Sequence, residues 1–164
     1  MRAMKMWTFA ILAAVAAIVI LPKDAPAQSR ALQARLQNAA RVDCSFPQIS
    51  KGNWNDDGPE FSLEAAEFTA AFFDIDVESG TAEAEGRFGA SYIIVRYAEG
   101  YLHFMQTLNS GPLYLTTILA QPTVDGRLKA VHTRHEYTQV SLPGFTSRPE
   151  MYIGDCSVES ASQD

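Results

Sequence analysis

The segment 131–138, VHTRHEYT, places two histidines, an arginine and a glutamate within eight residues. Two histidines so close together raise the question of a zinc site, which needs ligands that converge on one ion at about 2 Å. If the segment is a strand, however, His132 and His135 point to opposite faces of the sheet, because successive side chains alternate. We therefore expect no metal site from this pair.

One face of the same strand gathers His132, Arg134 and Glu136. The simpler interpretation, which we adopt as the expectation, is a solvated strand face with a charge pair. The alternative is a polar floor inside a barrel, where an arginine and a histidine orient the anionic or carbonyl end of an otherwise apolar ligand. Leu128 and Ala130 on that face favour the alternative, so these three polar residues are the candidate ligand-binding residues.

The acidic segment 74–85, DIDVESGTAEAE, places carboxylates in a calcium-loop register. It departs from the EF-hand pattern at Ser79, where the loop needs glycine, and no helix is predicted after it. A strand-turn-strand hairpin with an acidic rim explains the same residues. Weak calcium binding is kept as the alternative.

Motifs of catalysis are missing from the sequence. It contains no G-x-S-x-G elbow, and Gly86 and Gly89 lie between predicted strands instead of before a helix, as a phosphate loop requires. Paired carboxylates occur, but an acidic chain supplies them without any catalytic purpose. We therefore expect a protein that is not an enzyme and has no cofactor.

The N-terminus has the order of a secretory signal peptide. Arg2 and Lys5 precede an uncharged apolar run at 7–21, which is followed by an A-x-A site ending at Ala27. An uncleaved membrane anchor is the alternative, although the run is shorter than the roughly 20 residues that span a bilayer. We expect a signal peptide over 1–27, cleavage after Ala27, and a periplasmic or extracellular protein with no stable membrane span.

The mature chain is acidic. Removal of three basic residues and one acidic residue with the signal peptide changes the formal charge from -6 to about -8. The remaining basic residues are scattered, so the chain has no electrostatic footprint for nucleic acid and little attraction for anionic membranes. The partners we expect are a small apolar ligand or another protein.

The two cysteines, Cys44 and Cys156, each occupy an Asp-Cys-Ser tripeptide near the two ends of the mature chain. In an exported protein two such cysteines predict a structural disulfide. A redox pair is the alternative, but the sequence has no C-x-x-C motif. We therefore predict a bridge between Cys44 and Cys156.

The composition along the chain predicts an all-β fold preceded by one short helix. Helix formers at helical spacing predict an amphipathic helix at 29–40, within an N-terminal segment 28–43, and a polar loop after Cys44 opens a single β domain over 44–164. Short β-rich runs separated by turn signals are typical of an antiparallel meander that closes into a small β-barrel or folds into a sandwich. The stretch 59–67 has both helical and strand character and is left open. The predicted strands are 68–77, 81–86, 91–97, 101–108, 113–120, 127–138 and 150–156.

Gly52-Asn53-Trp54 resembles the G-x-W motif that opens the first strand of lipocalins, which are exported eight-stranded barrels that carry small apolar ligands. The resemblance implies a calycin-like, ligand-carrying β-barrel, with a disulfide that reaches the C-terminal region. The sequence departs from the lipocalin pattern after Trp54, where a turn replaces a continuing strand.

Two functions follow from these observations. The first is an exported, non-catalytic β-barrel that binds a small apolar or amphipathic ligand. Its apolar interior would be drawn from Phe72, Ile93, Val95, Leu102, Phe104 and Leu115. The alternative is an envelope interaction or structural protein that has a filled core and recognises another protein through a sheet edge or loops. A cavity of a few hundred Å³ favours the first function.

Overall fold

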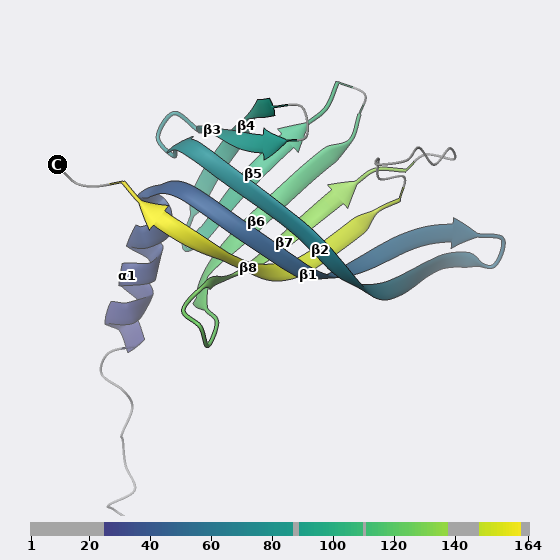
Figure 1. Cartoon of the computed structure of the whole chain (residues 1–164), viewed down its shortest axis with the longest axis horizontal. Coiled ribbons are helices and arrows are strands. Elements are labelled where there is room, and N and C mark those ends of the chain that lie inside the picture. The colour runs from purple at the N-terminus through teal and green to yellow at the C-terminus, as the bar shows by residue number, and fades with distance from the viewer. Residues whose placement is uncertain (1–24, 87–88, 110, 138–147, 162–164) are drawn as a thin grey trace, which may run out of the picture.

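The computed structural model describes residues 25–86, 89–109, 111–137 and 148–161. Within these ranges one helix precedes eight antiparallel strands, which pair in sequence order and close into a ring because β8 returns to pair with β1 (Figure 1). Most of the predicted signal peptide, 1–24, lies outside the described residues. The elements are α1 (Ala25–Gln37), β1 (Ala39–Asn55), β2 (Gly58–Asp76), β3 (Thr81–Gly86), β4 (Gly89–Ala98), β5 (Tyr101–Thr107), β6 (Leu113–Pro122), β7 (Leu128–His135) and β8 (Glu150–Ser160).

The all-β class is confirmed, but one strand was missed. β1 occupies the region that was expected to be the end of the helix and a polar loop, and α1 ends at Gln37. Pro47 is typical of a loop, but it lies at a bulge, where the register of β1 with β8 shifts between Ser45 and Gln48 and β1 has one residue more than β8. A proline at a bulge does not interrupt the ladder, since the extra residue is unpaired there. The open stretch 59–67 is a strand, the first half of β2.

The interior of the ring is filled by alternate residues of all eight strands. Phe72 and Phe104 stack at its centre with ring centroids 4.0 Å apart. The predicted interior is confirmed except for Leu115, which is only partly buried because its neighbours Thr116 and Ile118 occupy the inward positions of β6. The buried apolar residues of the strands are Ala39, Val42, Cys44, Phe46, Ile49, Phe72, Ala82, Ile93, Val95, Leu102, Phe104, Ile118, Leu128, Ala130, Tyr152, Cys156 and Val158.

Helix α1 packs at one end of the ring (Figure 1). Leu36 is fully buried in the core, and the guanidinium of Arg35 donates two hydrogen bonds to the carbonyl oxygen of Val158, at 3.1 and 2.8 Å. No helix in the described ranges is long and apolar enough to cross a membrane. The opposite end of the ring, where β7 ends and β8 begins, is not covered by α1.

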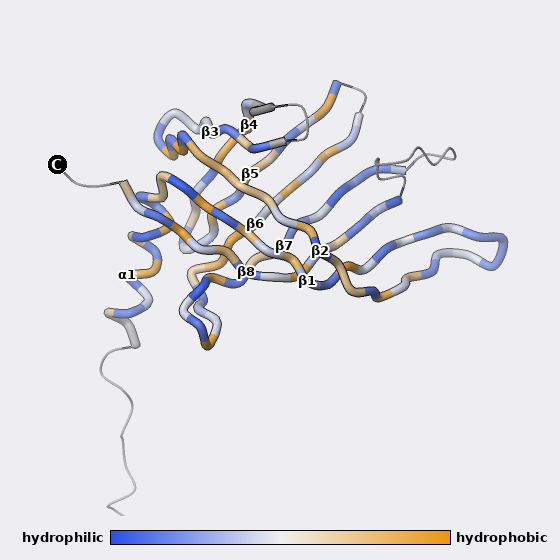
Figure 2. Tube along the Cα trace, viewed as in Figure 1, coloured by the Kyte–Doolittle hydropathy of each residue, from blue (hydrophilic) through white to orange (hydrophobic). Residues whose placement is uncertain are grey.

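The β1–β2 hairpin extends beyond the other strands at this opposite end (Figure 1). β8 accompanies β1 only as far as Lys51, which pairs with Glu150. The tip of the hairpin is hydrophilic (Figure 2). We refer to residues 52–61 of this hairpin as the arm.

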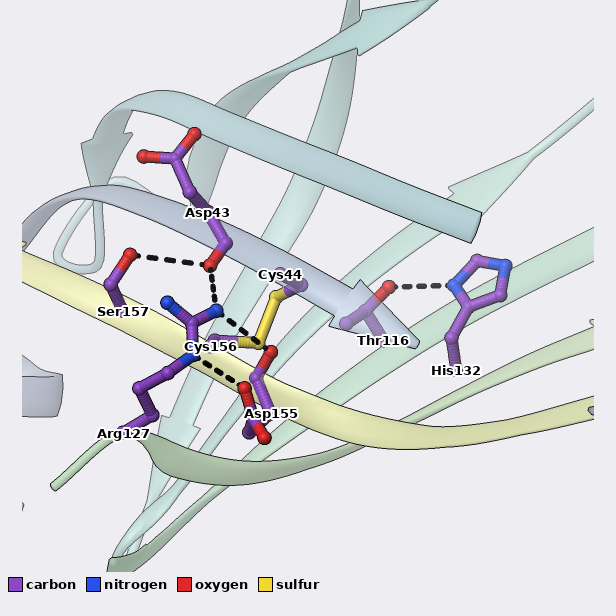
Figure 3. Close-up of a disulfide and its surroundings, with 8 residues drawn as sticks. All are labelled: Asp43, Cys44, Thr116, Arg127, His132, Asp155, Cys156 and Ser157. Carbon is purple, nitrogen blue, oxygen red and sulfur yellow. Dashed lines mark hydrogen bonds and ion pairs between the residues drawn. A yellow bond between two sulfur atoms is a disulfide. The ribbon is translucent and has the colours of Figure 1, made fainter. Parts of the chain in front are cut away.

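The predicted disulfide between Cys44 and Cys156 is present, and both cysteines are buried (Figure 3). The two Asp-Cys-Ser tripeptides lie antiparallel on β1 and β8, so that each aspartate faces a serine and the cysteines face each other. This arrangement explains why the same tripeptide occurs twice. The bridge ties the first strand of the ring to the last.

An ion pair reinforces the same junction from outside. Arg127 pairs with the carboxylate of Asp155 and donates to the carbonyl oxygen of Asp43 at 3.1 Å (Figure 3). Because Arg127 precedes β7 while Asp43 and Asp155 belong to β1 and β8, the side chain connects three neighbouring strands.

Candidate functional site

The face of β7 that carries His132 is turned into the ring. His132 lies opposite Thr116 of β6 and Tyr152 of β8, and only 6% of its surface is exposed. His135 is exposed on the outside, so the prediction that the two histidines point to opposite faces is confirmed. The expectation of a solvated face for His132 and Arg134 was wrong. Alternation along a strand defines two faces, but it does not reveal which one faces the core.

The hydrogen bonds of His132 define its protonation state. Nδ1 lies 2.8 Å from the hydroxyl of Thr116 (Figure 3), and Nε2 lies 3.3 Å from Nε of Arg134. An arginine can only donate, so Nε2 must be the acceptor and Nδ1 carries the proton that is donated to Thr116. Burial, together with the charge of Arg134, lowers the pKa of His132 to about 3. The imidazole is therefore neutral at ordinary pH.

The guanidinium of Arg134 is surrounded by aromatic rings from three other strands. Its central carbon lies 4.6 Å from the ring centroid of Phe68, 5.2 Å from that of Tyr152 and 5.6 Å from that of Tyr114. The side chain is 22% exposed. Contacts of this kind stabilise a cation by about 0.5–2 kcal/mol each, more when water is excluded. The aromatic side chains hold the positive charge of Arg134 in a fixed position, at the end of the strand ring that lies opposite α1.

Two carboxylates complete the cluster. Glu150 accepts a hydrogen bond from the hydroxyl of Tyr152 at 2.6 Å and one from Arg134 at 3.4 Å. Glu136 accepts one from Tyr114 at 3.0 Å. Burial is the main cause that raises the pKa of both tyrosines, followed by the hydrogen bond to the adjacent carboxylate. Both phenols therefore act as donors toward Glu150 and Glu136.

An open pocket of about 380 Å³ lies in front of this cluster. Its wall combines apolar surface from β1 and β2 with the guanidinium of Arg134, and Lys51 stands at its rim, paired with Glu64 at 2.7 Å. The pocket is thus a shallow cup with an aromatic wall and a fixed cation. It is lined by Ile49, Lys51, Ala65, Ala66, Glu67, Phe68, Arg134, Glu150 and Tyr152.

The three predicted site residues lie together. His132 and Arg134 are in contact, and Glu136 joins them through Tyr114, although it lies just beyond the end of β7. Four further residues of the cluster were not predicted from the sequence: Phe68, Tyr114, Glu150 and Tyr152. Alternation along β8 places Glu150 and Tyr152 on one face, but their approach to Arg134 follows only from the register of β7 with β8.

The acidic segment 74–85 comprises the end of β2, the turn at 77–80 and most of β3. Oδ1 of Asp76 accepts the backbone N–H groups of Glu78 and Ser79, both at 2.9 Å. These hydrogen bonds lower the pKa of Asp76. The arrangement is that of a hairpin turn. Across the part of the chain that the structure describes, no three His, Cys, Asp or Glu side chains are grouped so that they could hold a metal ion.

The lipocalin-like tripeptide does not open the first strand. Gly52-Asn53-Trp54 lies at the end of β1, in the arm, where Trp54 is 56% exposed and meets Tyr137 edge-on at 5.2 Å. The implied placement at the start of a strand was therefore wrong. No family model, curated protein or solved structure matches this chain.

Proposed function

We propose that the protein is an exported, non-catalytic, calycin-like barrel that binds a small amphipathic molecule at its open end. The observation that carries this proposal is the position of Arg134, which is mostly buried among aromatic rings and forms part of the wall of an open pocket of about 380 Å³. A cation that is fixed beside apolar surface can orient one end of a ligand while the rest is desolvated.

The lining defines the chemistry of the ligand. Its apolar body would lie against Phe68, Tyr152 and Ile49, and its polar end would accept hydrogen bonds from Arg134. Arg134 also donates to Nε2 of His132 at 3.3 Å and pairs with Glu150 at 3.4 Å, so these neighbours help to fix its position in the pocket wall.

The size of the pocket limits the ligand. A volume of about 380 Å³ lies at the lower end of the range for small-molecule sites, roughly 300–1,000 Å³. The deeper interior toward α1 is filled by side chains such as Phe104 and Leu102. We infer that the ligand is small and planar or short-chained, and that it enters the open end without threading the ring.

An exported location fits the same account. The disulfide between Cys44 and Cys156 persists in oxidising compartments, such as the periplasm or the extracellular space. Cleavage after Ala27 would leave most of α1 in place, including Arg35 and Leu36, which attach it to the ring.

Native mass spectrometry of protein purified from the exporting host tests the proposal. We expect the mature chain to carry a retained small molecule, which is absent from R134A and present in R41A. Arg41 is a matched control because its exposed side chain pairs with Asp43 far from the pocket. A bare wild-type mass, together with no binding of added anionic aromatic probes, would contradict a binding role.

A protein-recognition role is the second candidate. It is favoured by the filled core near α1 and by Phe61 and Leu63, which are 80% and 72% exposed on β2. Large apolar side chains exposed together commonly mark a surface that contacts another protein.

A further inference from the structure

One side of β2 has a described strand neighbour only at its C-terminal end. There Phe72, Phe73 and Asp76 pair with β3, whereas no described strand pairs with that side between residues 58 and 71. The other side of β2 is paired with β1 throughout. In an antiparallel sheet every second residue directs its backbone N–H and C=O to the same side. The first 14 residues of β2 therefore present a row of backbone donors and acceptors along one edge.

Natural proteins usually block such an edge with charged side chains, proline or a bulge. Of the three carboxylates in residues 58–71 of β2, two are engaged elsewhere. Glu60 accepts hydrogen bonds from Asn53 and Asn55 at 3.1 and 3.0 Å, and Glu64 pairs with Lys51 at 2.7 Å. All three partners belong to β1, so the charges are held toward the paired side of the strand. Neither of these two carboxylates lies along the free edge, so that Glu67 and Pro59 are the charged residue and the proline that remain in this stretch.

The side chains beside this edge are apolar and strongly exposed. Phe61 is 80% exposed and Leu63 is 72% exposed, and both point to the outer face, together with Ala65. An edge with unpaired backbone groups and exposed apolar side chains is a template for pairing with another strand.

We propose that β2 pairs antiparallel with β2 of a second copy of this chain, so that two rings share one continuous sheet. The register that we propose places Leu63 opposite Leu63 on the two-fold axis. Phe61 then faces Ala65, and Ser62 faces Glu64. Registers centred on Ser62 or Glu64 would instead place Glu60 opposite Glu64, or Glu64 opposite itself, and like charges directly opposite are destabilising.

The occupant is a second copy because the edge is complementary to itself in this register. Each carboxylate meets an uncharged residue, and each large apolar residue meets an apolar one, although the chain as a whole carries a formal charge of -6. A two-fold interface of this kind is isologous and closes at two subunits. It also brings Phe61 of the second copy next to Ala65, which lines the pocket, so that the dimer borders the opening.

Sedimentation velocity of the exported protein between about 1 and 100 µM tests the proposal, a range that spans weak to moderate self-association. The wild type should sediment as a dimer, and L63E should raise the dimer dissociation constant at least tenfold. Y92E is the matched control, because Tyr92 on β4 is 84% exposed and lies outside the free edge. A wild-type monomer at the highest concentration, or equal weakening by L63E and Y92E, would overturn the proposal.

Cross-linking tests the register separately. Two Leu63 side chains that face each other across antiparallel strands are close enough for a disulfide when both are replaced by cysteine. L63C should run as a covalent dimer without reductant and as a monomer with reductant, whereas Y92C should stay monomeric. Absence of a covalent L63C dimer would exclude this register, and an equal yield from Y92C would show random collision.

Discussion

Nε of Arg134 donates to Nε2 of His132 across 3.3 Å, and Nδ1 of the same imidazole donates to Thr116. Burial keeps His132 neutral, and the permanently charged side chain next to it acts in the same direction. A charged imidazole would lose the hydrogen bond from Arg134 and face a like charge, in addition to the cost of burial. The polar cluster is therefore arranged around one cation, and that cation lines the pocket.

The stability of the fold should depend on the titration of His132. The pKa of His132 is about 3 in the folded chain and about 6.5 when unfolded. Below pH 6.5 the unfolded chain therefore binds a proton that the folded chain does not, so stability falls as pH falls. Above pH 6.5 neither state binds it, and His132 makes no pH-dependent contribution.

We expect the free energy of unfolding of the wild type to fall by about 2 kcal/mol more than that of H132Q between pH 7 and pH 5. Urea unfolding at the two pH values measures the difference. Equal losses in the two proteins would show that His132 accepts a proton in the folded state as readily as in the unfolded one.

The disulfide should contribute a large part of the stability, because it joins residues that are 112 positions apart. For a loop of this length, constraint of the unfolded chain is worth about 4–5 kcal/mol. In urea unfolding, the free energy of unfolding of the double variant C44A/C156A should be lower than that of the wild type by about this amount. The denatured wild type should show no reactive thiol. A loss below about 1 kcal/mol would mean that the bridge closes a chain that is already constrained.

Gly154 should tolerate no side chain. A methyl group at this position would collide with the backbone carbonyl oxygen of Ser45 and lie 2.8 Å from Cα of Phe46, next to the bulge in β1. Backbone atoms cannot rotate away, so G154A should destabilise the fold by about 3 kcal/mol or more.

G52A serves as the control for this prediction. Its added methyl group would meet side-chain atoms of Phe61 and Pro149 at 3.3 Å, and such atoms can shift by a few tenths of an ångström. Thermal unfolding should therefore show a much smaller loss of stability for G52A than for G154A. Similar losses for the two variants would contradict the distinction between backbone and side-chain contacts.

Much of the ring could be predicted from turn signals. Pairs such as Glu99-Gly100 and Asp125-Gly126 end strands within a few residues of the predicted positions, because glycine adopts the positive φ angles that these turns require. β1 was missed because its proline and glycine resemble a loop when the partner strands are unknown. The bulge at Pro47 and the pairing with both β2 and β8 make it a strand.

The site could be predicted only in part. Alternation placed His132, Arg134 and Glu136 on one face, and the structure brings them together. Whether that face was inside depended on closure of the ring, which is a long-range property. Phe68 reaches Arg134 from β2, which is far away in the sequence, and Glu150 reaches it from the next strand, β8, through the register of β7 with β8. No local sequence pattern predicts these contacts.

The most direct test of the binding role compares two probes that differ in charge. Anilinonaphthalene sulfonate is an anionic aromatic molecule, and phenylnaphthylamine is its uncharged counterpart. In fluorescence titrations R134A should bind the anionic probe about 1.5–3 kcal/mol more weakly than the wild type, the range for a hydrogen bond to a charged group. It should bind the neutral probe equally well, and R41A should match the wild type with both. If R134A and R41A bind the anionic probe as tightly as the wild type does, Arg134 does not orient a ligand and the proposed function is wrong.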